Sequence, residues 1–170
     1  MQSHDGSVHH NCLLWNPYYK NFGKRLIKAP KLYFVDTGLA CSLLNIKNVT
    51  ELSAHYLRGG LVESFIISDL FKQSYNMDRK PSLYFWRDLT GNEIDCIVEQ
   101  ALTITPIEIK AGTTVNSDYF KQFNYLKKVE EFPEGKKFVI YAGQEKQQWP
   151  DAEVMGWQDS GNLIESIVAE

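Results

Sequence analysis

Two acidic residues and one lysine stand where neighbouring β-strands would bring them together. Glu108 and Lys110 are two residues apart in an apolar run that begins at Pro106, and Asp95 lies in the preceding run. Successive side chains of a strand point to opposite faces, so these three polar groups are expected on one face and the isoleucines on the other. Two carboxylates and one ammonium on adjacent strands suit a divalent-metal site for phosphodiester hydrolysis.

The strands that position these groups form a predicted antiparallel meander between residues 83 and 110. Three runs rich in β-branched and aromatic residues are separated by turn signals, including Thr90-Gly91-Asn92. In the middle run, one face is expected to carry Ile94, Cys96 and Val98, and the other Glu93, Asp95, Ile97 and Glu99. In the third run, Ile107 and Ile109 are expected to face the core.

Helical patterns precede and follow the meander. Residues 61–73 read as a helix, Ser117 can cap a second helix over 118–131, and the apolar run 137–142 reads as a buried strand. The third strand, the second helix and this last strand form a βαβ unit, so the last two strands should be parallel. The order helix, three strands, helix, strand therefore predicts a mixed α/β sheet flanked by helices.

Glu63 is the acidic residue that the first helix would carry toward the sheet. On a helical wheel it falls among Ile66, Ile67 and Leu70, whereas Ser64, Ser68 and Lys72 form the solvated side. An acid on an apolar arc is costly unless it has a partner, such as a metal ion or a lysine on the sheet. Asp69 also lies near the apolar arc, so both a functional and a structural role remain open for Glu63.

The first 58 residues read as a β/α extension of a domain over 59–170. Short strands are expected at 12–15 and 32–35, a helix capped by Asp36 reaches about Leu44, and a second short helix covers 50–57. Arg58-Gly59-Gly60 is expected to end that second helix.

A basic segment over residues 18–31 carries five cations and no acid. The cations are Lys20, Lys24, Arg25, Lys28 and Lys31, interleaved with Tyr18, Tyr19 and Phe22. Basic and aromatic side chains together suit a nucleic-acid backbone with base stacking, but the same pattern fits a solvated loop that pairs with acids elsewhere. Arg87, near the end of the first strand, would contact a phosphate or pair with Asp88, Glu93 or Asp95.

Composition limits the class of protein. The 170 residues are 44% hydrophobic and 13% aromatic, which is enough for one cored domain. The net charge of −3 gives no global attraction for nucleic acid, so a local patch must supply any contact. The three cysteines are far apart and form no C-x-x-C pair, so they indicate neither a zinc ribbon nor a disulfide framework, and a reducing cytoplasm is expected. The chain has neither a signal-peptide pattern nor an apolar run that could span a membrane.

The element order, with Asp95 followed by Glu108-Ile109-Lys110, resembles the PD-(D/E)XK nuclease superfamily. That resemblance implies a restriction-endonuclease-like αβββαβ core, with Glu63, Asp95, Glu108 and Lys110 as the catalytic set. It also implies Mg²⁺ or Mn²⁺ held by Asp95, Glu108 and Glu63, together with the backbone carbonyl of Ile109. DNA is the implied substrate.

A second resemblance covers most of the chain. The motifs NPYYKNFGKRLIKAPKLYFVDTGLA, GGLVESFIISDL, LYFWRDLTGNEIDCIVE and PIEIKAG are similar to the uncharacterised C-terminal domain of a prokaryotic family of AAA-type ATP-binding proteins. It implies an ATPase module as a partner. No G-x-x-x-x-G-K-[ST] motif is present, so this chain carries no ATP site of that type.

Three functions remain open at this point. The chain is a metal-dependent nuclease domain acting on DNA, a non-catalytic DNA- or partner-binding module of an AAA-type ATPase, or a purely structural domain whose carboxylates form ion pairs. In the structural case, Glu108 and Lys110 are the solvated face of an amphipathic strand, and Asp95 pairs with Lys110 or Arg87 across the sheet.

Overall fold

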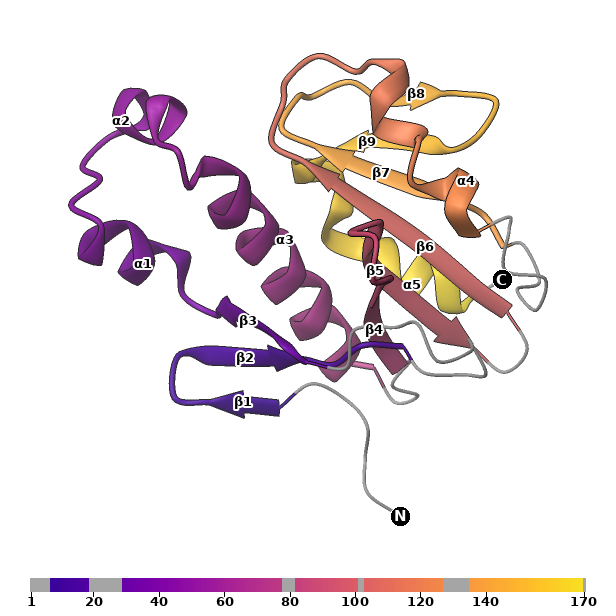
Figure 1. Cartoon of the computed structure of the whole chain (residues 1–170), viewed down its shortest axis with the longest axis horizontal. Helices are drawn as coiled ribbons and strands as arrows, with labels where there is room; N and C mark the ends of the chain where they lie inside the picture. Colours follow the sequence, from indigo (N-terminus) through magenta and orange to yellow (C-terminus); the bar gives the residue numbers. More distant parts are fainter. Residues whose placement is uncertain (1–6, 19–28, 78–81, 101–102, 127–134, 170) are drawn as a thin grey trace.

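A six-stranded mixed sheet forms the centre of the molecule (Figure 1). The computed structural model describes residues 7–18, 29–77, 82–100, 103–126 and 135–169. The strand order is β4-β5-β6-β7-β9-β8, with the bounds β4 (Ser82–Arg87), β5 (Glu93–Gln100), β6 (Thr103–Lys110), β7 (Phe138–Tyr141), β8 (Gln147–Gln148) and β9 (Glu153–Gly156). The meander β4-β5-β6 is antiparallel, whereas β6 pairs with β7 in parallel. Both predictions for these strands are confirmed.

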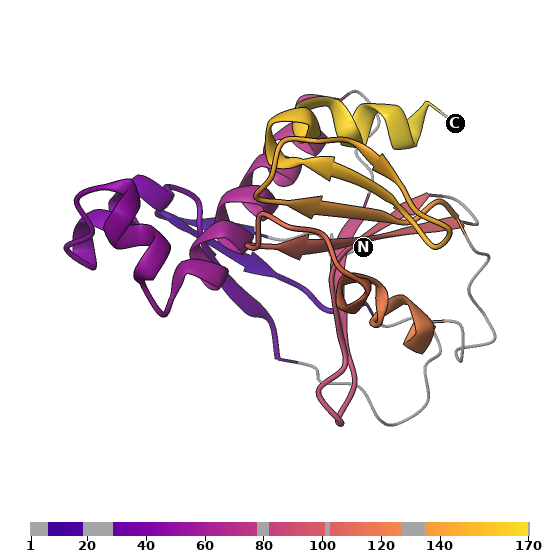
Figure 2. The ribbon, with the colours of Figure 1, turned by 90° about the horizontal axis from the view of Figure 1, so that it is seen from above.

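Helices cover both faces of this sheet (Figure 2). On one face lie α3 (Arg58–Tyr75) and α5 (Leu163–Val168), which follows the 3₁₀ turn η2 (Trp157–Asn162). On the other lie the 3₁₀ turn η1 (Ser117–Phe120) and α4 (Phe123–Leu126). Each face has its own apolar cluster because most strand interiors carry apolar residues on both sides.

A smaller antiparallel sheet and two helices precede α3. The sheet has the order β1-β2-β3, and the elements are β1 (Ser7–His9), β2 (Cys12–Trp15), β3 (Lys31–Phe34), α1 (Thr37–Leu43) and α2 (Val49–Ala54). The Asp36 side chain accepts a hydrogen bond from the N–H of Leu39 at 2.9 Å, which confirms the predicted helix cap. Trp15 and Tyr33 from this sheet are buried in the same cluster as α3.

Two predictions about α3 were wrong. Residues Arg58 to Gly60 do not break a helix but form the first turn of α3, where added side chains at Gly59 and Gly60 would meet nothing within 4 Å. The cost of about 1 kcal/mol per glycine is outweighed by burial of the following turns. Ser64 and Ser68 are buried rather than solvated, because α3 packs against several neighbours as well as the sheet.

The helix predicted over 118–131 is shorter in the described part of the chain. It begins as the separate turn η1, which Asn116 caps instead of Ser117, and α4 follows at Phe123. Residues 127–134 lie outside the described residues. No helix in the described residues combines the length and hydropathy needed to cross a bilayer.

Candidate functional site

An irregularity in β5 determines where Asp95 lies. Asp95 and Cys96 together face the single residue Phe85 of β4, which is the geometry of a β-bulge. The regular pairs on either side are Tyr84 with Ile97 and Trp86 with Ile94. The bulge therefore inserts one extra residue at the position of the predicted metal ligand.

The bulge changes which side chains share a face. Ile94 and Ile97 both belong to the cluster under η1 and α4, whereas Cys96 and Val98 belong to the cluster under α3. The prediction that Ile94, Cys96 and Val98 share a face was therefore wrong. Asp95 joins Cys96 on the α3 side, because two consecutive residues of a bulge lie opposite one partner.

Asp95 also lies where two strands separate. The pairing of β5 with β6 ends at Cys96 and Ile107. Beyond that pair, the N–H of Ile109 donates to Oδ2 of Asp95 at 2.8 Å. The carboxylate thus takes the place of a backbone acceptor at the end of the ladder, and its position is fixed by β6.

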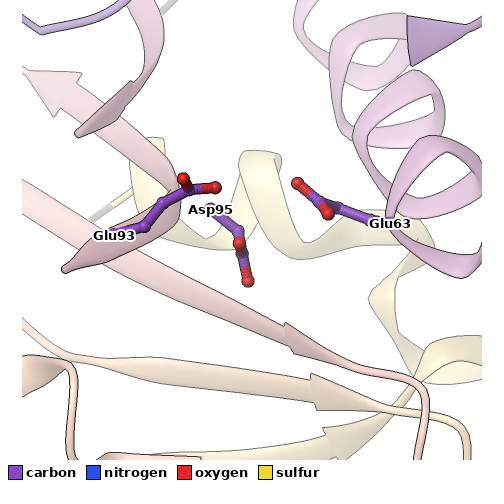
Figure 3. A group of neighbouring side chains, drawn as sticks. All are labelled: Glu63, Glu93 and Asp95. Atoms are coloured by element: carbon purple, nitrogen blue, oxygen red, sulfur yellow. The ribbon is translucent and has the colours of Figure 1, made fainter. Parts of the chain in front are cut away.

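Three carboxylates meet on the α3 side of the sheet (Figure 3). Glu63 reaches the group from α3, and Glu93 and Asp95 come from β5, with one oxygen of each within 4.8 Å of the others. Such a group of hard oxygen donors could hold a divalent cation. Glu93 was missing from the predicted site, although its place two residues before Asp95 was a signal that could have included it.

Glu108 and Lys110 form a buried pair on β6. The side chain of Glu108 is 1% exposed, and Nζ of Lys110 donates to its Oε2 at 2.5 Å. Its other oxygen, Oε1, is buried without a hydrogen-bond partner among the described residues. Burial and the nearby charge of Asp95 raise the pKa of Glu108 well above its usual value, against the opposing effect of Lys110.

The pKa of Asp95 depends on neighbours from α3, β3 and β6. Burial and the charge of Glu63 raise its pKa to about 6, while Lys110, Lys31 and the N–H of Ile109 oppose that rise. Burial alone would lower the pKa of Lys110, but Glu108 and Asp95 outweigh it and the net direction is upward. Asp95, Glu108 and Lys110 are therefore electrostatically coupled, although the bulge rather than simple alternation brings Asp95 to the site.

The N-terminal sheet contributes two side chains to the same site. Nζ of Lys31 lies 2.5 Å from Oε1 of Glu63 and also binds Glu93, while the hydroxyl of Tyr33 donates to Oε1 of Glu63 at 2.5 Å. Nε of Arg87 donates to the second oxygen of Glu93. The partner that the sequence required for Glu63 is thus a lysine, and it comes from β3. No sequence pattern pointed to Tyr33, because its contact arises only from the packing of β3 on α3.

The structure describes only two of the six residues that were predicted to contact nucleic acid, namely Lys31 and Arg87. Lys20, Lys24, Arg25 and Lys28 lie outside the described residues. Lys31 and Arg87 point to carboxylates, and a role for them in binding nucleic acid stays a prediction. Pairing with Glu93 was one of the alternatives for Arg87.

The donor chemistry fits Mg²⁺ or Mn²⁺. The cluster offers carboxylate oxygens, which these hard cations prefer, and no thiolate or imidazole ligand belongs to the group found among the described residues. Within the part of the chain that the structure describes, Oε1 of Glu108 is a buried acceptor without a protein donor, as expected of an atom that binds an ion. The residues therefore fit the metal that the resemblance implies.

Comparison with known families accounts for most of the chain. Residues 58–159 match the family described as Domain of unknown function (DUF4143). The chain belongs to the DUF4143 family. A second family, Domain of unknown function (DUF8612), matches residues 11–50. Six of the site residues lie within the DUF4143 match, namely Glu63, Arg87, Glu93, Asp95, Glu108 and Lys110. Lys31 and Tyr33 lie within the second match.

Two curated relatives are themselves uncharacterised. They are the proteins Mb2031c of Mycobacterium bovis and Rv2008c of Mycobacterium tuberculosis, each 34% identical over 98 residues. The similarity covers 58% of this chain and 21% of each relative, so this DUF4143 chain matches about a fifth of the length of these relatives.

Proposed function

We propose that this DUF4143 chain hydrolyses phosphodiester bonds of DNA in a reaction that depends on Mg²⁺ or Mn²⁺. The observation that carries this proposal is the position of Asp95. Its carboxylate is fixed at the end of the β5–β6 ladder by the N–H of Ile109, and it is coupled to the Glu108–Lys110 pair. Oε1 of Glu108, which belongs to this pair, is buried and has no hydrogen-bond donor among the residues that the structure describes.

Asp95 and Glu108 would hold the ion, with the carbonyl oxygen of Ile109 as a further ligand and Glu63 beside them. A bound ion would supply Lewis-acid polarisation of the phosphoryl group and a lower pKa for coordinated water. The bond from Ile109 holds Asp95 in one orientation, which reduces the entropy lost when ligands are arranged around an ion.

Lys110 would bind the transition state. Its ammonium is held beside Glu108, and its raised pKa keeps it protonated at neutral pH. A fixed cation at this place would orient the attacking water and stabilise the negative charge that develops on phosphorus oxygens. Because Glu108 also contacts Lys110, loss of either side chain would misplace the other.

Two further features support the finer assignment to a restriction-endonuclease-like fold. The chain follows the order helix, three strands, helix, strand from α3 to β7, and the Glu-x-Lys pair lies on the third strand of the meander. These agree with the resemblance to the PD-(D/E)XK superfamily. DNA as the substrate rests on that resemblance and on the basic segment 18–31.

A cleavage assay tests the proposal. Plasmid and single-stranded DNA are incubated with the protein and Mg²⁺ or Mn²⁺, beside the variants Asp95→Asn and Lys110→Ala. We expect the wild type to cleave, each variant to lose at least about 100-fold in rate, and the exposed control Asp118→Asn to match the wild type. Cleavage that survives both substitutions would refute these roles, and a folded wild type that cleaves nothing would refute the nuclease function.

A specific surface feature favours a second function, a non-catalytic module that binds a partner such as an AAA-type ATPase. An apolar pocket of about 210 Å³ lies among α1, α2, α3 and η2, and its lining includes Cys41, Phe65 and Trp157. Large apolar side chains nearby are exposed, including Leu43, Val49 and Tyr56. Exposed apolar surface of this kind often marks a protein interface. Metal-independent binding to the ATPase module without DNA cleavage would favour this function.

A further inference from the structure

We propose that the ammonium of Lys31 stands in for a second divalent cation, so that this site binds a single metal ion beside Asp95 and Glu108. The inference rests on the proposed metal-dependent function and concerns how that function is built. In this inference, Lys31 determines how many metal ions the site binds. Lys31 belongs to β3, which lies outside the DUF4143 match.

The positive charge of Lys31 lies between the carboxylates of Glu63 and Glu93. Glu63 and Glu93 approach each other within 4.8 Å, a separation at which like charges repel strongly unless a cation lies between them. Nζ of Lys31 contacts an oxygen of each, at 2.5 Å for Glu63. The ammonium therefore bridges the two carboxylates as a bound ion would.

The position of Lys31 is fixed by its surroundings. In the backbone pairing of β2 with β3, Lys31 lies opposite Trp15. Nζ of Lys31 lies 5.2 Å from the ring centre of Tyr33 and 5.6 Å from that of Phe85. The side chain is only 15% exposed. Aromatic faces attract an ammonium, so Lys31 is held in the cluster and is not a mobile surface side chain.

Oε1 of Glu63 and both oxygens of Glu93 are engaged by protein donors. Tyr33 donates to Glu63, and Arg87 donates to the second oxygen of Glu93. By contrast, the described residues give Asp95 one hydrogen bond, from Ile109, and leave Oε1 of Glu108 with none. Glu93 and Oε1 of Glu63 therefore have less capacity left for an ion than Asp95 and Oε1 of Glu108.

Charge balance leads to the same conclusion. With every group ionised, four carboxylates meet three cations, which are Lys31, Arg87 and Lys110. One divalent ion changes the net charge of this cluster from −1 to +1, which suits an anionic phosphodiester. A second ion would raise it to +3 in a largely buried place, which is unfavourable.

Calorimetric titration with Mn²⁺, together with Mn²⁺ electron paramagnetic resonance, tests the inference. We expect one ion per wild-type chain and two per Lys31→Met chain, with spectral broadening from paired ions in the variant. The exposed Lys72→Met control, on α3 but outside the cluster, is expected to bind one ion. Two ions in the wild type, or one in a folded Lys31→Met protein, would overturn the inference and leave the proposed nuclease function standing.

A second pair of variants keeps the inference testable if Lys31→Met does not fold. Glu63→Gln should retain one ion with Kd raised by about tenfold or less, because only a nearby charge is lost. Glu108→Gln should raise Kd by more than about 100-fold, because a direct ligand is lost. Equal loss of the ion in both variants would overturn the inference. A wild type that binds no ion would refute the proposed metal site itself.

Discussion

Asp95 and Glu108 are acids placed where burial disfavours their charged forms. Each has a raised pKa, in the case of Asp95 about 6, even though Lys110 lies close to both. A folded state that binds protons more tightly than the unfolded chain loses stability as the pH rises. Without a metal ion, the burial of these two carboxyl groups should therefore oppose folding near neutral pH.

Asp95→Asn is expected to stabilise the metal-free protein at pH 7.5. The ordinary pKa of an aspartate is 3.8 and that of folded Asp95 is about 6, so the wild type loses stability as the pH rises from about 4 to 7. The neutral amide can still accept from Ile109 but has no charge to bury. We expect a gain of about 1–3 kcal/mol at pH 7.5 and little change at pH 4.

Urea unfolding in EDTA at both pH values measures this difference. The exposed control Asp118→Asn should stay within about 0.5 kcal/mol of the wild type at each pH. A variant that is less stable than the wild type at pH 7.5 would contradict the assigned burial cost of Asp95.

At the residue scale, the sequence predicted several of the residues that the fold brings close together. Alternation and spacing selected Asp95, Glu108 and Lys110, and the helical wheel showed that Glu63 needed a partner. It could not show that the partner is Lys31 rather than a residue of the main sheet. That contact joins residues 32 positions apart through the packing of β3 on α3, and no local periodicity encodes it.

Among the elements, the β4–β5 hairpin carries Glu93 and Asp95 to the site. Its turn closes with the N–H of Asp88 donating to the carbonyl of Asn92 at 3.0 Å. The carboxylate of Asp88 accepts from Thr90 and Asn92, and Gly91 has φ = +90°. Only glycine adopts this conformation without strain, so the turn that the sequence predicted depends on Gly91.

Gly91→Ala should destabilise the protein by about 1–2 kcal/mol, because a side chain is strained at this φ even though the space is open. Gly60→Ala is the matched control, since it also points into open space but lies in the first turn of α3. That substitution should stabilise by about 0.5–1 kcal/mol. Thermal denaturation of both variants measures the contrast, and equal effects would refute the role given to φ.

Element types were easier to predict from sequence than the faces of strands. The apolar runs and turn residues gave β4, β5, β6 and the parallel β7 correctly. The bulge at Asp95 could not be read, because it arises from the mismatch of β5 with β4 and leaves the composition of β5 unchanged. One inserted residue reverses the direction of later side chains, so the predicted faces of β5 failed.

For the molecule as a whole, the N-terminal sheet and the α3 side of the main sheet share one core. Trp15 is fully buried and packs edge-on against Tyr33 of its own sheet and Phe71 of α3. The division into an extension over 1–58 and a domain over 59–170 remains a prediction. A shared core favours cooperative unfolding of both parts.

We therefore expect one thermal transition, seen at the same temperature by near- and far-ultraviolet circular dichroism. Trp15→Ala should lower the stability of the whole chain by about 3–5 kcal/mol, because a large buried side chain is lost. Leu32→Ala, at a largely exposed position of β3, should stay within about 0.5 kcal/mol of the wild type. Two separate transitions, of which Trp15→Ala shifts only one, would show that the parts unfold independently.

The backbone contact between residues 16–18 and β4 also bears on solubility. The N–H of Tyr18 donates to the carbonyl of Phe85 at 2.7 Å, and the N–H of Phe85 donates to Asn16 at 3.1 Å, so part of the outer edge of β4 is already paired. The opposite edge ends in β8, which is two residues long. Among the described residues, neither border of the six-stranded sheet therefore offers a long open ladder to another molecule, and pairing of folded chains through this sheet is disfavoured.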